Sequence, residues 1–461
     1  MITKYFTHVS VRFNPFSEAA KPVRLFIGRI PTASKSGCSI ERKILTGDEE
    51  PLVKVTFKDK EVMEINPQSK RFEDLRSYFD AHSRKLALKD AISDMFKFKS
   101  FIENLGLRAP IMQAPMAGVS TVEMVAEVAK VGGLGSLPMA SYDLTKNTEP
   151  VFEQIRRFKH LAGNAPVNVN FFAHDYKEQT PPGPTEQANW FKIMEKASGV
   201  SSEDLRSTIP QFERINVSFK EFEAKHDVKP FVEQLGKLNV KVVSFHFGLP
   251  KQQTVDLIHK EGILVFACVT NRKEAEAALA VGADVLVAQG YEAGGHRGAF
   301  ISPDEQLSTK ALFDNIVDLG KVIPAGGIID AEDVAEYLRK GAVAVSMGTI
   351  YVTSEESSAP GFIGNLVKSS SNLPPTVMTA LVSGKIARTV KTPFIESLEA
   401  QEKVPLPSYG YSYYAYKTAA KHFPPGCGFY LAGTNYGKVT PGDKSATITS
   451  RLWQEVQNRI G

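Results

Sequence analysis

The chain has 461 residues, 43% of them hydrophobic and 23% charged, and a formal net charge of +4 at pH 7. This composition is typical of a folded globular protein and excludes a disordered or fibrous one; the length predicts two domains, or one barrel with an addition. No uninterrupted apolar stretch reaches about 18 residues, which argues against a membrane span. The three cysteines form no CxxC pair, so the sequence predicts neither a metal site nor a disulfide framework.

The first fifth of the chain carries the whole positive excess. Residues 1–94 hold 17 Lys and Arg against 13 Asp and Glu, whereas the remaining residues are balanced. A cationic surface of this kind can meet phosphate, anionic lipid or an import receptor, although a surface excess of +4 is also compatible with an ordinary solvated face.

The same segment is patterned as a folded unit. Residues 7–13, with the sequence THVSVRF, alternate as a half-buried strand does. A helix limited by Pro22 is predicted over 18–30, a hairpin over 51–66, and an amphipathic helix over 71–92. These elements predict a compact β-α-β-β-α domain over residues 1–94.

Two stretches of this domain carry a resemblance to a known family. The sequences MITKYFTHVSVRFNPF at residues 1–16 and AHSRKLALKD at 81–90 resemble a small thioredoxin-like protein of the fungal mitochondrial large ribosomal subunit. The resemblance implies a mitochondrial location and binding to ribosomal RNA and ribosomal proteins. It does not imply a redox activity, since the CxxC motif is missing. The implied contact residues are Lys4, Arg12, Lys21, Arg24 and Arg29.

Beyond residue 95 short apolar runs alternate with amphipathic stretches. Several runs are almost continuously apolar, which is typical of parallel strands buried on both faces. The helical stretches 270–282 and 330–341 each end in glycine. Eight such units predict a (β/α)8 TIM barrel over residues 95–461. The eight predicted strands lie in residues 109–116, 132–139, 165–173, 240–248, 262–269, 283–290, 321–328 and 342–349.

In such a barrel the strand C-terminal ends converge on one mouth, where the chemistry takes place. The glycine-rich turns after the seventh and eighth strands, PAGGIID and SMGT, are positioned to bind phosphate through backbone N–H groups. No strand-linked GxGxxG opens a helix, so a Rossmann domain is not predicted. The residues predicted at the mouth are Gln113, Met116, Asn170, Ser244, His246, Gln289, Gly326, Gly327, Gly348 and Thr349.

The loop after the sixth strand has the sequence YEAGGHRG and displays one histidine, His296, and one arginine, Arg297, between glycines. The glycines allow the backbone to run close to a flat ring while His296 faces the substrate. Considered without its neighbours, the loop is also compatible with a tight turn that leaves the histidine exposed. Arg297 is predicted either to bind an anion or to face solvent or a carboxylate.

Seven ordered motifs carry a second resemblance. QAPMAGVST, GGLGSLPMASYDL, PVNVNFFAH, SFHFGLP, VAQGYEAGGHRG, PAGGIID and MGT together resemble the nitronate monooxygenase family, also called 2-nitropropane dioxygenase, from about Met95 to about Ala432. The resemblance implies an FMN-dependent, metal-free barrel. It implies oxidation of nitronates or nitroalkanes by dioxygen to carbonyl compounds, with release of nitrite and nitrate.

The resemblance also assigns roles to residues. His296 matches the catalytic base, and His246 lines the same pocket. Gln113 and Met116 are expected near the flavin ring. The other expected FMN contacts are Asn170, Gln289, Gly294, Gly326, Gly327, Ser346, Met347, Gly348 and Thr349.

Several alternatives stay open at this stage. Met95 stands where a free-standing enzyme would begin, so the chain is a true fusion, a joined translation of two adjacent genes, or an enzyme with a recruited targeting module. The location is mitochondrial if the first domain belongs to the protein, and otherwise cytoplasmic.

The rival functions are a ribosomal subunit with a passenger barrel and an NAD(P)H-dependent flavin reductase acting on quinones or enoyl thioesters. A helical excursion over residues 175–228 and the tyrosines near residue 410 are expected either to wall the pocket or only to pack.

Overall fold

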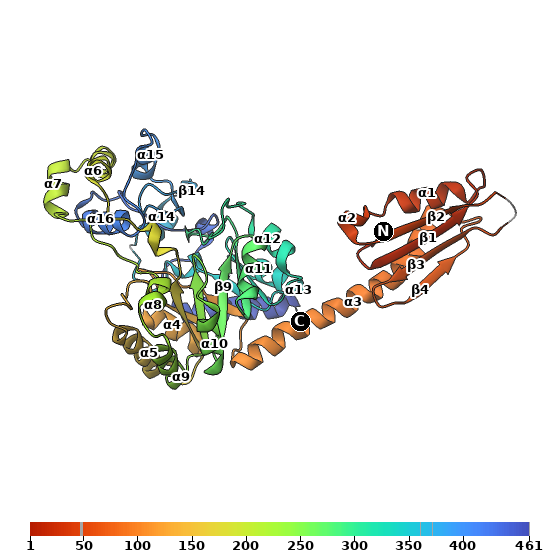
Figure 1. The fold of residues 1–461 in the computed structure, drawn as a ribbon, viewed down its shortest axis with the longest axis horizontal. Coiled ribbons are helices and arrows are strands. Elements are labelled where there is room, and N and C mark those ends of the chain that lie inside the picture. Colours follow the sequence, from red (N-terminus) through yellow and green to blue (C-terminus); the bar gives the residue numbers. More distant parts are fainter. Residues whose placement is uncertain (47–48, 360, 371, 461) are drawn as a thin grey trace. The chain divides into compact units, whose positions relative to one another are not determined.

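A computed structural model describes residues 1–46, 49–359, 361–370 and 372–460 (Figure 1). The chain divides into two compact units, Met1–Asp94 and Met95–Gly461. The helix α3 (Phe72–Leu105) begins in the first unit and ends in the second. Within the described residues, no helix is both long enough and apolar enough to cross a membrane.

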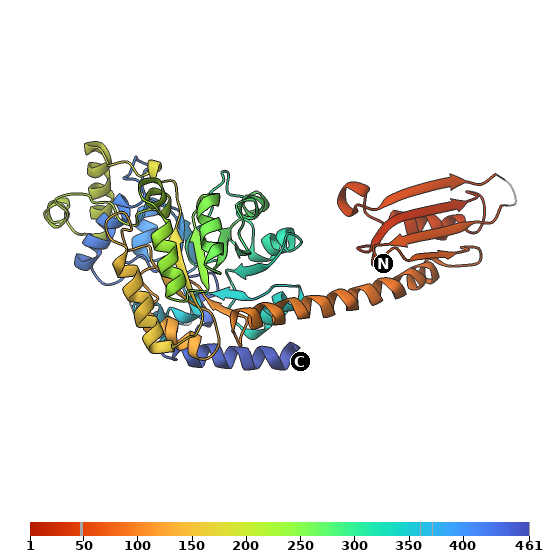
Figure 2. The same cartoon turned by 60° about the horizontal axis from the view of Figure 1, so that its bottom comes forward.

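The first unit is a mixed sheet covered on one face by two helices (Figure 2). Phe26 of α1 (Ala20–Gly28) and Phe79 of α3 have ring centroids 5.2 Å apart, and both rings contact Phe6 of the inner strand β1. The two helices therefore cover the same face of the sheet. The sheet order is β2-β1-β3-β4, with β1 parallel to β2 and antiparallel to β3. The strands are β1 (Phe6–Phe13), β2 (Ser39–Ile44), β3 (Leu52–Phe57) and β4 (Val62–Ile65).

The structure adds one strand to the order predicted for this unit. Strand β2, which follows the short helix α2 (Ala33–Ser36), was not predicted. It lies at the edge of the sheet, and five of its six side chains are exposed. Because both of its faces contact water, it lacks the alternation of apolar and polar residues that identifies a half-buried strand.

The second unit is a nearly closed barrel of eight parallel strands, as predicted. Their order is β5-β13-β12-β10-β9-β8-β7-β6, and a parallel bridge between Met112 and Leu134 brings the two ends of the sheet together. Each predicted apolar run contains one strand. The strands are β5 (Ile111–Gln113), β6 (Gly135–Pro138), β7 (Val167–Phe172), β8 (Val242–His246), β9 (Leu264–Val269), β10 (Val285–Gln289), β12 (Val322–Ala325) and β13 (Val345–Met347).

Amphipathic helices surround the barrel and pack their apolar sides on it. Thr121, Asn271 and Asp330 cap three of them by accepting hydrogen bonds from first-turn amides. The two helices predicted to end in glycine are confirmed as α11 and α13. The surrounding helices are α4 (Val122–Lys130), α5 (Glu149–Ala162), α9 (Lys229–Lys237), α10 (Gln252–Lys260), α11 (Arg272–Ala280), α12 (Thr309–Ile316) and α13 (Ala331–Arg339).

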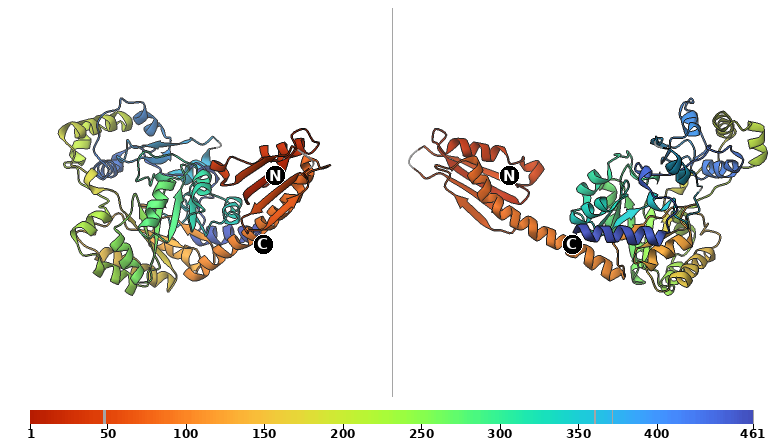
Figure 3. Two further views of the ribbon diagram at one scale, coloured as in Figure 1. Left: turned by 45° about the vertical axis from the view of Figure 1, so that its right-hand side comes forward. Right: turned by 180° about the vertical axis from the view of Figure 1, so that it is seen from behind.

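The N-terminal end of the barrel is closed by apolar side chains. Helix α17 (Ser445–Ile460) packs against the barrel between α13 and α4, and the last turns of α3 lie near it (Figure 3). Phe101 of α3 packs on Phe266 inside the barrel, with ring centroids 6.2 Å apart, and Ile448 and Leu452 of α17 join the same core. The opposite end is therefore the one left open for a ligand.

Additional elements gather at that opposite end. Between β7 and β8 lie α6 (Pro184–Ser198), α7 (Ser202–Thr208) and α8 (Phe219–Lys225), preceded by a short 3-10 turn, Tyr176–Glu178. Strand β11 (Gly295–His296) pairs with β15 (Ala387–Val390), which pairs with β14 (Thr376–Thr379). The C-terminal part adds α14 (Phe362–Ser369), α15 (Pro393–Glu399) and α16 (Tyr411–Ala419).

The structure gives Gln113 a part in closing the barrel. Its side chain is fully buried; Oε1 accepts from Ser136 N at 2.9 Å, and Nε2 donates to Ser120 Oγ at 2.9 Å. We predict that Gln113→Leu lowers the free energy of unfolding by about 1–3 kcal/mol, because the buried amide of Ser136 loses its acceptor. Urea denaturation measures this. The exposed Gln252→Leu serves as the control, and equal, small effects of both changes would contradict the role.

Candidate active site

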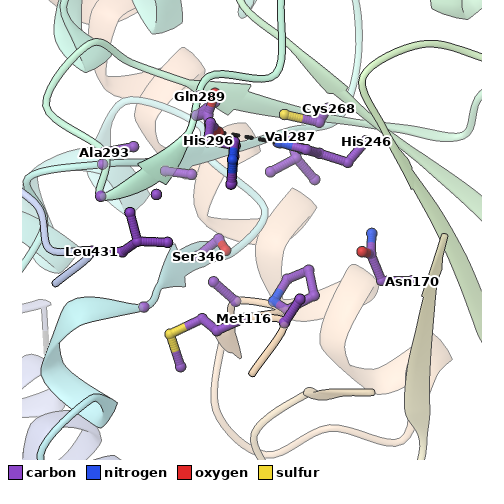
Figure 4. Close-up of a pocket in the computed structure, with 18 of the residues that line it drawn as sticks. Met116, Asn170, His246, Cys268, Val287, Gln289, Ala293, His296, Ser346 and Leu431 are labelled. Carbon is purple, nitrogen blue, oxygen red and sulfur yellow. Dashed lines mark hydrogen bonds between the residues drawn. The ribbon is translucent and has the colours of Figure 1, made fainter. Parts of the chain in front are cut away.

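A cavity opens at the C-terminal ends of the barrel strands, where the sequence predicted the site (Figure 4). Gln113 does not line it, since its amide is turned toward β6. The structure brings the other predicted residues together around this cavity: Met116, Asn170, Ser244, His246, Gln289, Gly294, His296, Gly326, Gly327, Ser346, Met347, Gly348 and Thr349.

Two of the turns at this mouth leave backbone amides unpaired. Gly326 and Gly327 follow β12 with φ of +111° and +71°, a conformation that favours glycine. Gly348 and Thr349 follow β13 and open a single 3-10 turn, Thr349–Tyr351. No hydrogen bond within the described residues uses the N–H groups of Gly327, Gly348 or Thr349. Unpaired amides at turns of this kind are suited to hold the oxygens of a phosphate.

The segment after Leu431 donates hydrogen bonds to both of these turns. Gly433 N donates to Thr349 Oγ1 at 3.0 Å, and Asn435 Nδ2 donates to the carbonyl of Gly327. Thr349 accepts a hydrogen bond here, so its own hydroxyl hydrogen stays available for a ligand. The segment after Leu431 therefore fixes the shape of the predicted phosphate site.

His296 lies among aromatic rings at the cavity wall. Its ring centroid is 5.6 Å from that of Tyr409, 5.5 Å from Tyr413 and 6.0 Å from Phe247. Burial lowers the pKa of His296 to about 3, with smaller contributions from His246 and from Lys385 and Lys417. The imidazole is therefore neutral at physiological pH and has a lone pair that can accept a proton.

His246 and Gln289 hold the backbone that carries His296. His246 Nε2 donates to the carbonyl of His296 at 3.3 Å, and Gln289 Nε2 donates to the same oxygen at 3.1 Å. Gln289 Oε1 accepts from Gly298 N at 2.7 Å. Burial lowers the pKa of His246 to about 4, so this ring is neutral as well. Both side chains line the cavity and also fix the loop in place.

Arg297 faces a carboxylate and not the cavity. Its Nε and Nη2 donate to the two oxygens of Asp304, each at 2.9 Å, and Nη1 donates to the carbonyl of Gln289 at 2.6 Å. Its side chain is 3% exposed. Glu274, fully buried, holds the next stretch by accepting from Phe300 N and Ile301 N. Of the alternatives predicted for Arg297, contact with a carboxylate is the one that the structure shows, and this ion pair anchors the loop.

Further residues line the cavity, which the sequence either did not single out or left undecided between lining the pocket and packing. Tyr409 and Tyr413 form part of the wall, and Asn216 donates to the Tyr409 hydroxyl at 2.9 Å. Asn216 has a φ of +57°, a left-handed conformation that asparagine adopts more readily than most residues. Cys268 also lines the cavity, and burial raises the pKa of its thiol to about 12. The excursion and the tyrosines thus do contribute to the pocket.

We predict that Asp304→Asn destabilises the protein by about 3 kcal/mol at pH 7, because it leaves the buried guanidinium without its counter-charge. Burial raises the pKa of Asp304, but the hydrogen bonds from Arg297 and from Gln306 N outweigh it, so the pKa is lowered overall from 3.8. The stabilisation is therefore complete above that value and is lost as the pH falls below it. Denaturation from pH 7 to pH 3 tests this, and a wild-type advantage that persists undiminished at pH 3 would contradict it.

Two segments of the chain match models of known families. Residues 99–440 match the family described as nitronate monooxygenase, and residues 13–60 match "39S ribosomal protein L53/MRP-L53". A structure of nitroalkane oxidase from Streptomyces ansochromogenes superposes with a TM-score of 0.62 at 24% identity, covering 77% of this chain and 98% of that one. This likeness shows the shared fold.

Sequence relatives support the match over most of the chain. A relative in the same family from Saccharomyces cerevisiae is 37% identical over 385 residues, which covers 77% of this chain and 93% of the relative. The nitronate monooxygenase of Pseudomonas aeruginosa is 34% identical over 321 residues, covering 69% of this chain and 86% of that protein. The chain belongs to the nitronate monooxygenase family.

Proposed function

We propose that the barrel binds FMN and uses dioxygen to oxidise nitronates and nitroalkanes to carbonyl compounds, with release of nitrite and nitrate. The observation that carries the proposal is a single cavity that combines unpaired backbone amides with a buried, neutral imidazole. The amides suit a phosphate group, and the imidazole suits an acidic carbon acid or its anion.

The residues around the cavity fit a phosphorylated flavin. Gly327, Gly348 and Thr349 offer N–H groups to the phosphate. Asn170 donates through Nδ2 to Ser244 Oγ at 2.9 Å. Among the described residues no hydrogen bond uses its Oδ1, which can therefore accept from an N–H of the flavin ring. Met116, Gly294, Gly326, Ser346 and Met347 complete the cofactor wall, and Gln289 orients the adjoining loop. When bound, FMN supplies the electron acceptor and the reaction with dioxygen.

The charges beside the cavity favour an anionic substrate. Lys385 Nζ lies 4.7 Å from the ring centroid of Phe247, and Lys417 Nζ lies 4.5 Å from that of Tyr413. A nitronate carries its negative charge on the nitro oxygens, so these two ammonium groups attract it. A neutral nitroalkane needs one more step, in which His296 takes a proton from the carbon next to the nitro group and the bonding electrons move onto the nitro oxygens.

We predict that His296→Asn retains bound FMN but loses nitroalkane turnover by about 100-fold or more, the size of a general-base contribution. Turnover of a preformed nitronate should fall much less, because that substrate has no proton to lose. Oxygen uptake and nitrite release, measured with a nitroalkane and with its nitronate, give the two rates. The flavin is identified after release from the denatured protein.

The exposed His160→Asn is the matched control and should leave both rates unchanged. An equal loss on both substrates in His296→Asn would remove His296 as the base. A wild-type protein with bound flavin that is inert toward nitronates would contradict the function itself.

We infer a second role for the first unit, on the separate observation that residues 13–60 match a ribosomal protein family. The unit would attach the enzyme to the mitochondrial large ribosomal subunit through RNA phosphates or neighbouring proteins. Its predicted contact residues are exposed, but they lie on different faces: Arg12 is on the open face of the sheet, whereas Lys21 and Arg24 lie on α1.

We predict that the full-length chain cosediments with mitochondrial ribosomes at low salt, and that replacing Arg12, Arg24 and Arg29 by glutamate abolishes this while leaving the oxidase rate unchanged. The reason is that phosphate contacts supply most of the salt-dependent affinity for nucleic acid. An antibody against the barrel detects the chain in gradient fractions. Absence from ribosomal fractions at every salt concentration would contradict the attachment.

A further inference from the structure

Among the described residues, the side chain of His296 has one hydrogen-bond partner. His296 Nε2 lies 2.9 Å from the hydroxyl of Ser383, which is fully buried. The rings of Phe247, Tyr409, Tyr413 and Phe429 lie around the imidazole. Among the described residues no hydrogen bond reaches its Nδ1. The two ring nitrogens are therefore in different surroundings.

The hairpin that carries Ser383 also holds the backbone of His296. Ser383 lies in the turn between β14 and β15, and β15 pairs with β11 so that His296 lies opposite Ala387. Arg297 N donates to the carbonyl of Ile386 at 2.9 Å. One rigid element thus fixes both the main chain and the ring of the histidine, which leaves the ring little freedom to turn.

The turn itself is fixed against the tyrosine wall. Gly384 has a φ of +80°, and a Cβ there would come within 2.7 Å of Tyr409 N. Ser412 of α16 donates through its hydroxyl to the carbonyl of Val382 at 3.2 Å. The position of the Ser383 oxygen is therefore set by backbone contacts on both sides of it.

The hydrogen bonds of Ser383 determine which histidine nitrogen carries the proton. A hydroxyl has a single hydrogen, and Ser383 donates it to the carbonyl of Lys385 at 2.9 Å, an oxygen that can only accept. Lys385 N in turn approaches Ser383 Oγ at 3.4 Å. Toward His296 the serine oxygen is thus an acceptor, so Nε2 must donate and Nδ1 is left with the lone pair.

We propose that Ser383 is a positioning residue that fixes His296 in the Nε2–H tautomer, so that Nδ1 is the atom that receives the substrate proton. This inference rests on the proposed function. In the step it describes, the carbon–hydrogen bond next to the nitro group breaks, the proton bonds to Nδ1, and the electron pair moves onto the nitro oxygens. The products are a nitronate and an imidazolium. His296 then acts on a nitroalkane as a base and is not an N–H donor to the nitro group.

The kinetic test compares Ser383→Ala with Ser383→Thr, which keeps the hydroxyl. Without the acceptor, the ring can exchange tautomers or turn, so we expect Ser383→Ala to lose ~10-fold in kcat with nitroethane, a part of a general-base contribution. Its KM and its turnover of preformed ethylnitronate should stay nearly unchanged, and Ser383→Thr should recover most of the lost rate. An equal loss on both substrates, or a threonine variant as slow as the alanine variant, would overturn the inference.

A second measurement does not depend on activity. Nitrogen-15 NMR of histidine-labelled full-length protein, with His296 identified by its absence in His296→Asn, distinguishes protonated from unprotonated ring nitrogens. We expect Nε2 protonated and Nδ1 unprotonated in the wild type, and a mixture in Ser383→Ala. A proton on Nδ1 in the wild type would overturn the inference. If the wild type proves inert toward both substrates, the proposed function fails, and the NMR result alone then decides the role of Ser383.

Discussion

The carbonyl oxygen of His296 is the point on which the arrangement of the site depends. It accepts hydrogen bonds from Gln289 and from His246, which belong to different strands of the barrel. Next to it, Arg297 is held by Asp304 and by the carbonyl of Gln289. A loop rich in glycine has high conformational freedom, and these buried polar contacts remove it. The histidine is presented rigidly because its neighbours, and not its own local sequence, fix the backbone.

Two kinds of element meet at this loop. The barrel brings the strand ends together and leaves unpaired amides at the turns after β12 and β13. The chain after β13 then covers this loop. Its β14–β15 hairpin pairs with β11, the strand that contains His296, and Tyr409 and Tyr413 place aromatic rings around the imidazole. The cover removes water from His296, and this burial keeps the ring neutral. In the proposed function, phosphate binding and proton transfer thus fall to separate parts of one cavity.

Much of this could be predicted from the sequence, since buried parallel strands are nearly continuous apolar runs and all eight of them were recognised. The exposed edge strand β2 was missed because neither of its faces is apolar. Gln113 was expected at the cofactor, but a strand-end amide can turn either toward the mouth or toward the next strand, and here it joins β5 to β6. The parts played by Arg297, Asn216 and the tyrosines depend on contacts between residues far apart in the chain, which no local pattern records.

The most direct test of flavin-dependent nitronate oxidation in this cavity is an anaerobic spectral titration of the purified 461-residue chain. One sample receives propionate 3-nitronate and the other NADPH. We expect the protein to carry a bound flavin whose visible absorbance is bleached by the nitronate and is unchanged by the nicotinamide. Full reduction by NADPH with an inert nitronate would instead identify a reductase, and a chain without bound flavin would contradict the role of the cavity altogether.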